Sequence, residues 1–310
     1  MRIEVYIKIE GGSFDPSFFN TAIKADLAGT IHSRSKVEKK IINGKEQYCV
    51  KGKMQYWKSE IIKIDHPDSS HPDKPLTELL SKLKTDLLKF CEAPEICITA
   101  EVVVKYKDSD PLRGFFFSKE TIQLLADIKA GLEIDVVSLM LPGIIPHFQY
   151  WCQHWLGELR GRFRTFREAP KFKVYIWIEG EQFNPNVFNA TLNAELRGSA
   201  LMNEKKVDNR IQFWRSEVME VSRDDPCPYP EEVLAKLLSN LKSDLLKVHE
   251  LPGIRIFAEV VADKNIKSLG GYFSLGGFFF SKEKIQHLAE IKASLNVSAN
   301  QRGHESKWSE

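Results

Sequence analysis

Hydrophobic and polar side chains alternate along the first residues of the chain. Ile3, Val5, Ile7 and Ile9 fall on one face at a period of two, which predicts a half-buried strand over residues 2–10. Two glycines end this strand, and an Asp-Pro pair then predicts the cap and first position of a short helix. The same succession returns in the second half of the chain, where VYIWIEG replaces VYIKIEG and Asn-Pro replaces Asp-Pro.

Leucines spaced three to four residues apart predict an amphipathic helix over residues 75–90, and the second half repeats this pattern. Strands are predicted to follow at 96–106 and 254–262. The expected buried positions of the first helix are Leu76, Leu79, Leu80, Leu83, Leu87 and Leu88, and those of the second are Val233, Leu234, Leu237, Leu238, Leu241 and Leu245.

One stretch of the chain is present twice almost unchanged. It reads GFFFSKETIQLLADIKAGLEIDV at 114–136 and GFFFSKEKIQHLAEIKASLNV at 277–297. In each copy a Ser predicts the cap of a helix, and alternating apolar residues after the helix predict a strand. The other paired segments, such as YWKSE and FWRSE, keep the same order, so we interpret the chain as a duplicated domain.

The duplication predicts an α+β protein of two similar domains, each with an antiparallel or mixed sheet and helices packed on one face. The first repeat spans 1–138 and the second 171–299, joined by an amphipathic helical linker over 139–170 and followed by a disordered tail at 300–310. Trp57 and Trp214 are expected at equivalent positions, as are Phe116 and Phe279.

The first repeat has about twelve more residues than the second between 34 and 64, where a hairpin turning at Asn43-Gly44 is predicted. Two interpretations remain open for the basic residues of this insertion. They form an arm that meets an acidic partner, or they are the solvated lysines that keep an edge strand from aggregating. The candidate partner-binding residues here are Lys36, Lys39, Lys40 and Lys45.

The linker has no counterpart in the repeats. Aromatic and aliphatic residues, including Trp151, Trp155, Leu159 and Phe163, fall on one helical stripe, and Arg160, Arg164 and Arg167 form a second stripe. Three interpretations compete: a bridge packed between the domains, a partner-binding helix and a helix on a membrane surface. In the first, the aromatic stripe is buried and the arginines remain available to an acidic partner.

Composition excludes several classes of protein. The net charge of +2 falls within the linker, which has four Arg against two Glu, and each repeat is balanced in charge. A nucleic-acid-binding domain normally has a basic excess, so no nucleic-acid partner is expected. No apolar run is long enough to span a bilayer. The five cysteines form no framework and no signal peptide is evident, so a cytoplasmic protein is expected.

Catalytic, cofactor-binding and metal-binding motifs are all missing. His66 and His71 have no third ligand nearby in the sequence, which makes a metal site a weak hypothesis. Glu101 and Glu259 occupy equivalent strand positions, but each stands alone in its repeat. No catalytic residue, no cofactor and no metal are therefore expected.

The order of the segments resembles a bacterial family without assigned activity, number 4279 among the domains of unknown function. The resemblance rests on VYIKIEGGSFDPSFFN and VYIWIEGEQFNPNVFN, on YWKSE and FWRSE, and on the closing GFFFSKE segments. It implies that each copy is a compact α+β domain. The family offers no catalytic residues to carry over.

The expected function is that of a non-enzymatic protein-binding protein. Its most concrete form is an immunity protein that neutralises a bacterial toxin enzyme by covering its active site. The alternative is an enzyme with an unrecognised site in the cleft between the two repeats.

Overall fold

The structure is a computed structural model, which describes residues 1–11, 14–23, 27–42, 45–65, 72–93, 95–106, 114–138, 171–181, 183–192, 198–202, 212–222, 229–262 and 278–299. The expectations for the linker at 139–170 and the tail at 300–310 concern residues outside these ranges, including the arginine and aromatic stripes.

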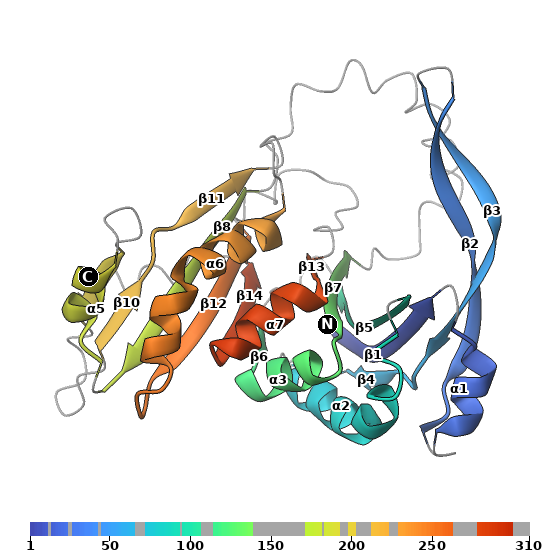
Figure 1. Ribbon diagram of the computed structural model, residues 1–310, viewed down its shortest axis with the longest axis horizontal. Coiled ribbons are helices and arrows are strands. Elements are labelled where there is room, and N and C mark those ends of the chain that lie inside the picture. Colours follow the sequence, from blue (N-terminus) through green and yellow to red (C-terminus); the bar gives the residue numbers. More distant parts are fainter. Residues whose placement is uncertain are drawn as a thin grey trace.

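The described chain forms two mixed sheets, each with its helices packed on one face (Figure 1). In the first, the long central strand β1 pairs antiparallel with β3, β4 and β5, and β7 pairs parallel with β5. Its strands are β1 (Arg2–Gly11), β2 (Thr30–Ile42), β3 (Lys45–Lys58), β4 (Ile62–Ile64), β5 (Ile96–Tyr106) and β7 (Gly131–Ser138), and the helices of the first half are α1 (Pro16–Ala22), α2 (Asp73–Leu87) and α3 (Lys119–Asp127).

The second sheet repeats this arrangement, with β8 as its central strand. β8 pairs antiparallel with β10, β11 and β12, and β14 pairs parallel with β12. Its strands are β8 (Lys171–Gly180), β9 (Ser199–Met202), β10 (Gln212–Arg215), β11 (Met219–Ser222), β12 (Arg255–Ala262) and β14 (Ala293–Ala299), and its helices are α5 (Pro185–Thr191), α6 (Pro230–Val248) and α7 (Lys282–Glu290). The predicted α+β fold of two similar domains is thus confirmed.

Local contacts around the two buried tryptophans are the same in both halves. The Asn20 side-chain oxygen accepts hydrogen bonds from Trp57 Nε1 at 2.9 Å and from the Gly29 amide at 2.8 Å. In the second half, Asn189 accepts from Trp214 Nε1 at 3.0 Å and from the Gly198 amide at 2.9 Å. Both indole rings are fully buried, so each asparagine satisfies an indole donor that has no access to water. The expected equivalence of the two tryptophans is confirmed.

Two short phenylalanine strands cross from one half to the other. β6 (Phe115–Phe117) pairs with β14 of the second sheet, and β13 (Phe278–Phe280) pairs with β7 of the first sheet. Phe116 and Phe279 lie opposite equivalent residues, Asn296 and Glu133, but each in the sheet of the other half.

The helices that follow these strands, α3 and α7, contact each other where the two halves meet (Figure 1). The buried side chains of both halves form one continuous hydrophobic core. From the sequence, each FFF segment, 115–117 and 278–280, is expected within its own repeat, whereas in the structure these segments join the two halves. Because each strand completes the other half's sheet, the two domains are expected to fold as one unit.

Helix ends follow the sequence signals in most cases. Asp15 and Asn184 accept hydrogen bonds from backbone amides of α1 and α5, each with a proline in the first turn. Ser118 caps α3 through the Thr121 amide at 3.3 Å, whereas Ser281 occupies the cap position of α7 without that bond. The carboxylate of Asp73, at the start of α2, also accepts from the Ser118 amide at 2.8 Å, and this ties α2 to α3.

The predicted hairpin is present, with pairing that runs from Thr30 and Lys58 to Ile42 and Lys45. It extends well beyond the body of its sheet (Figure 1). Residues 62–64, predicted to belong to the rising strand, instead form β4 and pair with β1. Leu88 was expected in the core, but it follows the last turn of α2 and is 41% exposed.

Candidate functional site

The sequence-predicted binding residues cannot be assembled into one site. Arg160, Arg164 and Arg167 lie outside the described residues. Lys36, Lys39 and Lys40 lie on β2 and Lys45 begins β3, so all four belong to the hairpin, whose backbone alone is described at these positions.

A polar cluster occupies the sheet face that the helices leave uncovered in the first half, where β1, β3, β5 and β7 run side by side. The odd-numbered residues of β1 point into the core, so the even-numbered ones lie on this opposite face. The Glu101 carboxylate accepts a hydrogen bond from the Tyr6 hydroxyl and forms an ion pair with Lys8 Nζ at 2.5 Å. The Lys58 ammonium lies 3.4 Å from the centre of the Tyr6 ring.

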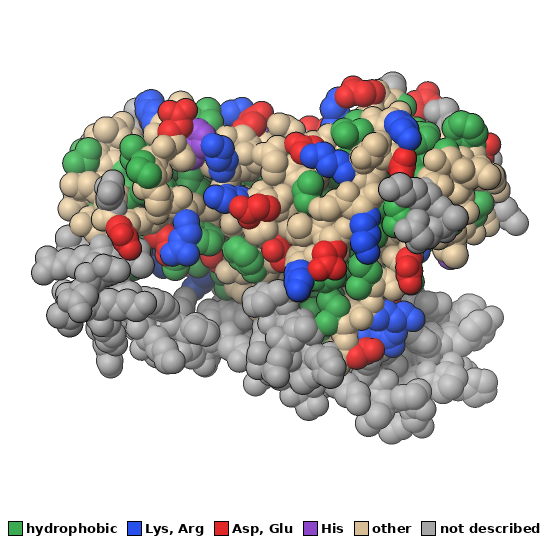
Figure 2. All heavy atoms as spheres, turned by 90° about the horizontal axis from the view of Figure 1, so that it is seen from below, with side chains coloured by type: hydrophobic (Ala, Val, Ile, Leu, Met, Phe, Trp, Pro, Cys, Tyr) green, Lys and Arg blue, Asp and Glu red, His purple; other side chains and the backbone are tan. Residues whose placement is uncertain are grey.

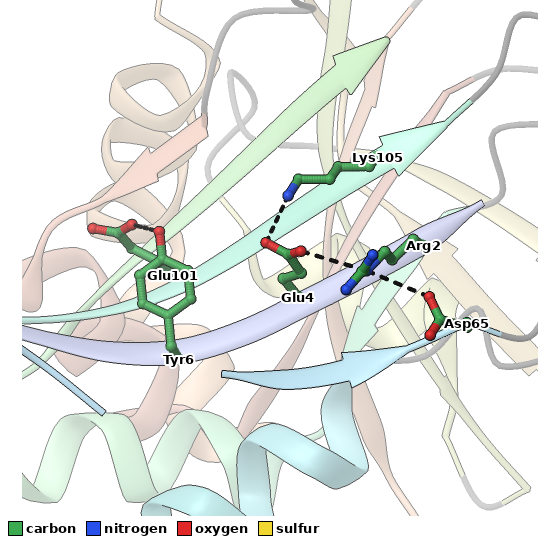
Figure 3. Close-up of polar contacts among 6 residues, drawn as sticks. All are labelled: Arg2, Glu4, Tyr6, Asp65, Glu101 and Lys105. Carbon is green, nitrogen blue, oxygen red and sulfur yellow. Dashed lines mark hydrogen bonds and ion pairs between the residues drawn. The ribbon is translucent and has the colours of Figure 1, made fainter. Parts of the chain in front are cut away.

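A second group of charges continues along the same strands (Figure 3). Glu4 binds Lys105 Nζ at 2.8 Å and Arg2 Nε at 3.4 Å, and Arg2 also approaches Asp65 at 3.4 Å. Burial raises the pKa of Glu4, but the hydrogen bond and charge of Lys105, with help from Arg2, bring it below its usual value. These contacts pair the carboxylates of Glu4 and Glu101 with cations of the same chain.

Tyr6 and Lys8 on this face both have raised pKa values, for different reasons. Burial and the hydrogen bond to Glu101 raise the pKa of Tyr6 far above its usual range. Burial tends to lower the pKa of Lys8, but the hydrogen bond and charge of Glu101 outweigh this and raise it. Both shifts favour the protonated forms of Tyr6 and Lys8, so the Glu101 carboxylate keeps a hydroxyl donor and an ammonium donor.

The corresponding face of the second half keeps part of this pattern and changes the rest. Strand register places Tyr175 opposite Glu259, as it places Tyr6 opposite Glu101. The guanidinium of Arg215, at the position of Lys58, lies 5.7 Å from the Tyr175 ring centre. At the position of Lys8 the second half has Trp177, which stands opposite Phe257.

Trp177 lies within a group of aromatic rings on this face. It stacks on Phe213 with ring centres 5.8 Å apart and meets the edge of Phe257 at 5.6 Å. Phe257 is in turn 6.5 Å from Phe116, which the exchanged strand β6 brings from the first half. We call Trp177, Phe213, Phe257 and Phe116 the aromatic face.

Two donors at the aromatic face have no acceptor. Trp177 Nε1 and Arg215 Nε are both shielded from solvent and make no hydrogen bond, although their side chains are only half-buried. An N–H group in this condition costs about 1–3 kcal/mol of stability. This loss of stability is regained when a bound molecule supplies hydrogen-bond acceptors for the two N–H groups.

The Glu259 carboxylate lies beside the aromatic face and is 8% exposed. It accepts hydrogen bonds from the Asn296 amide at 3.1 and 3.0 Å, whereas the equivalent Glu101 has an ion pair with lysine. Burial raises the pKa of Glu259 to about 7, and the hydrogen bond from Asn296 opposes this only in part. Among the described residues, no cation forms an ion pair with this carboxylate.

A pocket of about 400 Å³ lies where the halves meet, between α7 and the residue that follows α3. Its lining includes Lys129 from the first half and Glu283, His287 and Glu290 from α7. The enzyme alternative requires Glu and His from different elements, whereas Glu283, His287 and Glu290 all lie on α7. The pocket is also shallow, and the hydrogen bond from Ser281 lowers the pKa of Glu283, which is the opposite of the shift that a general acid needs.

Metal and membrane sites find no support in the described part of the chain. No group of three or more His, Cys, Asp or Glu in those ranges lies close enough to hold a metal ion. No described helix is both long and apolar enough to cross a membrane. On the surface seen in Figure 2, basic and acidic side chains are interspersed, without a broad patch of one sign.

Part of the functional signal was visible in the sequence. The paired segments YIKIE and YIWIE show the change from Lys8 to Trp177, and Glu101 and Glu259 were recognised as equivalent. The contacts among Tyr6, Glu101 and Lys8 were missed, because they depend on the register of strands far apart in the chain.

The fold and these two faces define a two-domain α+β protein with exchanged strands and uncovered polar sheet faces. Residues 1–139 match the family model described as "Domain of unknown function (DUF4279)", so the first half is a domain similar to this family, as its sequence indicated. No curated protein matches the chain.

One solved structure, of an unknown protein from Galdieria sulphuraria, covers 83% of this chain and 98% of its own. The two are 10% identical with a TM-score of 0.17, and this likeness supports no argument about fold or function.

Proposed function

We propose that the chain is a protein-binding protein without catalytic activity, and that it binds its partner through the aromatic face of the second sheet. The observation that carries this proposal is the combination of four half-buried aromatic rings with two unpaired N–H donors, those of Trp177 and Arg215. Tryptophan, tyrosine and arginine dominate the energy of protein interfaces, because they combine a large apolar surface with hydrogen-bonding groups.

The dimensions of the sheet suit such a role. Eight residues of strand span about 26 Å and six strands span about 24 Å from first to last, which gives a face of roughly 600 Å². Each partner in an interface of standard size contributes about 800 Å². The face and its rim are therefore large enough for a specific complex.

The most concrete form of this function is immunity: the protein binds a toxin enzyme of bacterial competition and covers its active site. Steric occlusion requires no chemistry from the inhibitor, only a surface that fits the rim of the enzyme's active site. Such a protein acts in the cytoplasm, where an incoming toxin finds its target.

Co-expression of the chain with the product of the neighbouring reading frame tests the proposal. We expect that product to stop growth on its own and growth to return when the chain is present. Trp177→Ala should abolish the rescue, whereas Phe18→Ala, which removes a ring that is 64% exposed on α1, should preserve it. A neighbouring product that is harmless, or a rescue that survives Trp177→Ala, contradicts the proposal.

A further inference from the structure

The two sheet faces differ at one position in a way that indicates a ligand. In the first half, Lys8 reaches across from β1 and places its ammonium 2.5 Å from the Glu101 carboxylate on β5. In the second half, the residue at the position of Lys8 is Trp177, and the carboxylate at the position of Glu101 is Glu259. The second carboxylate has kept its place and its burial but has lost the ammonium group.

What replaces the lysine is suited to a cation from outside. Trp177, with Phe213 stacked on it and Phe257 at its edge, lies on the same face as the carboxylate, because the pair Trp177–Phe257 is the next same-face pair to Tyr175–Glu259. Aromatic faces attract cations through their negative electrostatic potential, and the attraction grows when water is excluded. A buried carboxylate flanked by such rings combines the two features that proteins use to bind alkylammonium groups.

The charged groups nearest this carboxylate do not already fill the position. Arg255 forms an ion pair with Glu179, and Arg215 lies over the Tyr175 ring. On β14 the neighbour of Glu259 is the neutral Asn296, where the first half has Glu133. Lys173 is two residues before Tyr175 on the same face of β8 and stands opposite Val261, two pairs beyond Glu259.

From this internal comparison we propose that Glu259 and Trp177 form a binding site for a primary alkylammonium group, and that its natural occupant is a lysine side chain of the protein partner. The ammonium takes the place that Lys8 fills in the first half, and its alkyl chain lies against the Trp177 ring. A lysine fits better than an arginine, because the equivalent intramolecular contact is made by a compact ammonium with three donors. The identity of the occupant rests on the proposed function, whereas the site itself does not.

Titration of the full-length protein with n-butylammonium chloride at pH 8 tests the site, with the Trp177 indole N–H signal in NMR spectra as the reporter. We expect saturable shifts of this signal. n-Butanol, which has the same shape without the charge, should bind at least tenfold more weakly. Glu259→Gln should also weaken butylammonium binding at least tenfold.

Two reciprocal substitutions give the sharpest control, with Trp57 and Trp214 indole signals showing that each variant is folded. Trp177→Lys should fill the site from within and abolish butylammonium binding, read in this variant from the side-chain amide signals of Asn296, which bonds Glu259. Lys8→Trp should remove the internal lysine and create a second butylammonium site beside Glu101. Equal binding to wild type and Glu259→Gln, or no saturable binding to wild type, overturns the site.

The site and the proposed function fail in different ways. A protein that binds butylammonium through Glu259 but does not rescue growth overturns the proposed function alone. A protein that rescues growth equally well with and without Glu259→Gln overturns the lysine site alone. Preference for tetramethylammonium over butylammonium would also overturn it, because a quaternary cation cannot donate hydrogen bonds to the carboxylate.

Discussion

The exchanged phenylalanine strands make a prediction that two independent domains would not make. Phe117 belongs to the first half of the sequence, but its strand pairs with β14 in the second sheet, and its side chain is fully buried. Phe280 is its counterpart in the second half and pairs with β7 of the first sheet. Truncating either ring should therefore weaken the sheet of the other half.

Burial of a phenylalanine contributes about 1.5–3 kcal/mol by transfer from water. The cavity left by truncation to alanine brings the usual cost to about 3–5 kcal/mol. We expect Phe117→Ala and Phe280→Ala each to lower the free energy of unfolding by this amount in urea titrations. Phe18→Ala, at a position that is 64% exposed, should change it by less than about 0.5 kcal/mol.

Hydrogen exchange can locate the damage. Phe117→Ala should speed amide exchange in β14, at Leu295 to Val297, more than in β7, and Phe280→Ala should do the reverse. If Phe117→Ala loosens β7 and leaves β14 protected, the strands are not exchanged and the reasoning is refuted. Two separate unfolding transitions in the wild-type protein would also contradict it, because interlocked halves should unfold together.

Five further substitutions, in three tests, address other parts of the account. Asn20→Ala and Asn189→Ala should each cost about 2–4 kcal/mol in urea unfolding, because each leaves a buried indole and a backbone amide without an acceptor; clearly unequal costs would argue against equivalent halves. Lys129 and Lys292 both follow a helix with positive φ, of 51° and 52°, so replacing either with glycine should raise stability by about 1 kcal/mol; a loss would show that the lysine side chain matters more than the backbone. Burial raises the pKa of Glu259 from 4.5 to about 7, so its contribution to the free energy of unfolding is full below pH 4.5 and is lost as the pH rises through 7. The stability of Glu259→Gln relative to wild type should therefore be roughly 2–3 kcal/mol higher at pH 8 than at pH 5. A difference in stability that does not depend on pH would contradict the raised pKa.

Local features of the fold could be predicted because they depend on neighbouring residues. The Asp15 and Ser118 caps, the alternating strand from Ile3 to Ile9 and the hairpin all follow from short-range rules. The strand exchange could not be predicted in this way. The GFFFSKE segment is the same in both halves, so its sequence cannot specify which of two similar sheets it joins.

The candidate site was predictable only in part, for a related reason. Comparison of the repeats shows that Trp177 replaces Lys8, but not that either side chain lies beside a carboxylate on another strand. That contact depends on the pairing of β1 with β5 and of β8 with β12, which is set by the whole sheet. Basic residues of the hairpin stood out in the sequence because they are close together, whereas the aromatic face is assembled from four separate strands.

The affinity of the chain for the product of the neighbouring reading frame, the toxin enzyme of our proposal, tests the central claim most directly. Titration calorimetry with an inactive form of that enzyme would compare wild type, Trp177→Ala and the exposed-ring control Phe18→Ala. If the aromatic face carries the binding energy, Trp177→Ala should raise Kd at least 30-fold, which corresponds to about 2 kcal/mol, and the control should leave Kd unchanged. A Kd that is the same for wild type and Trp177→Ala would show that the partner binds elsewhere.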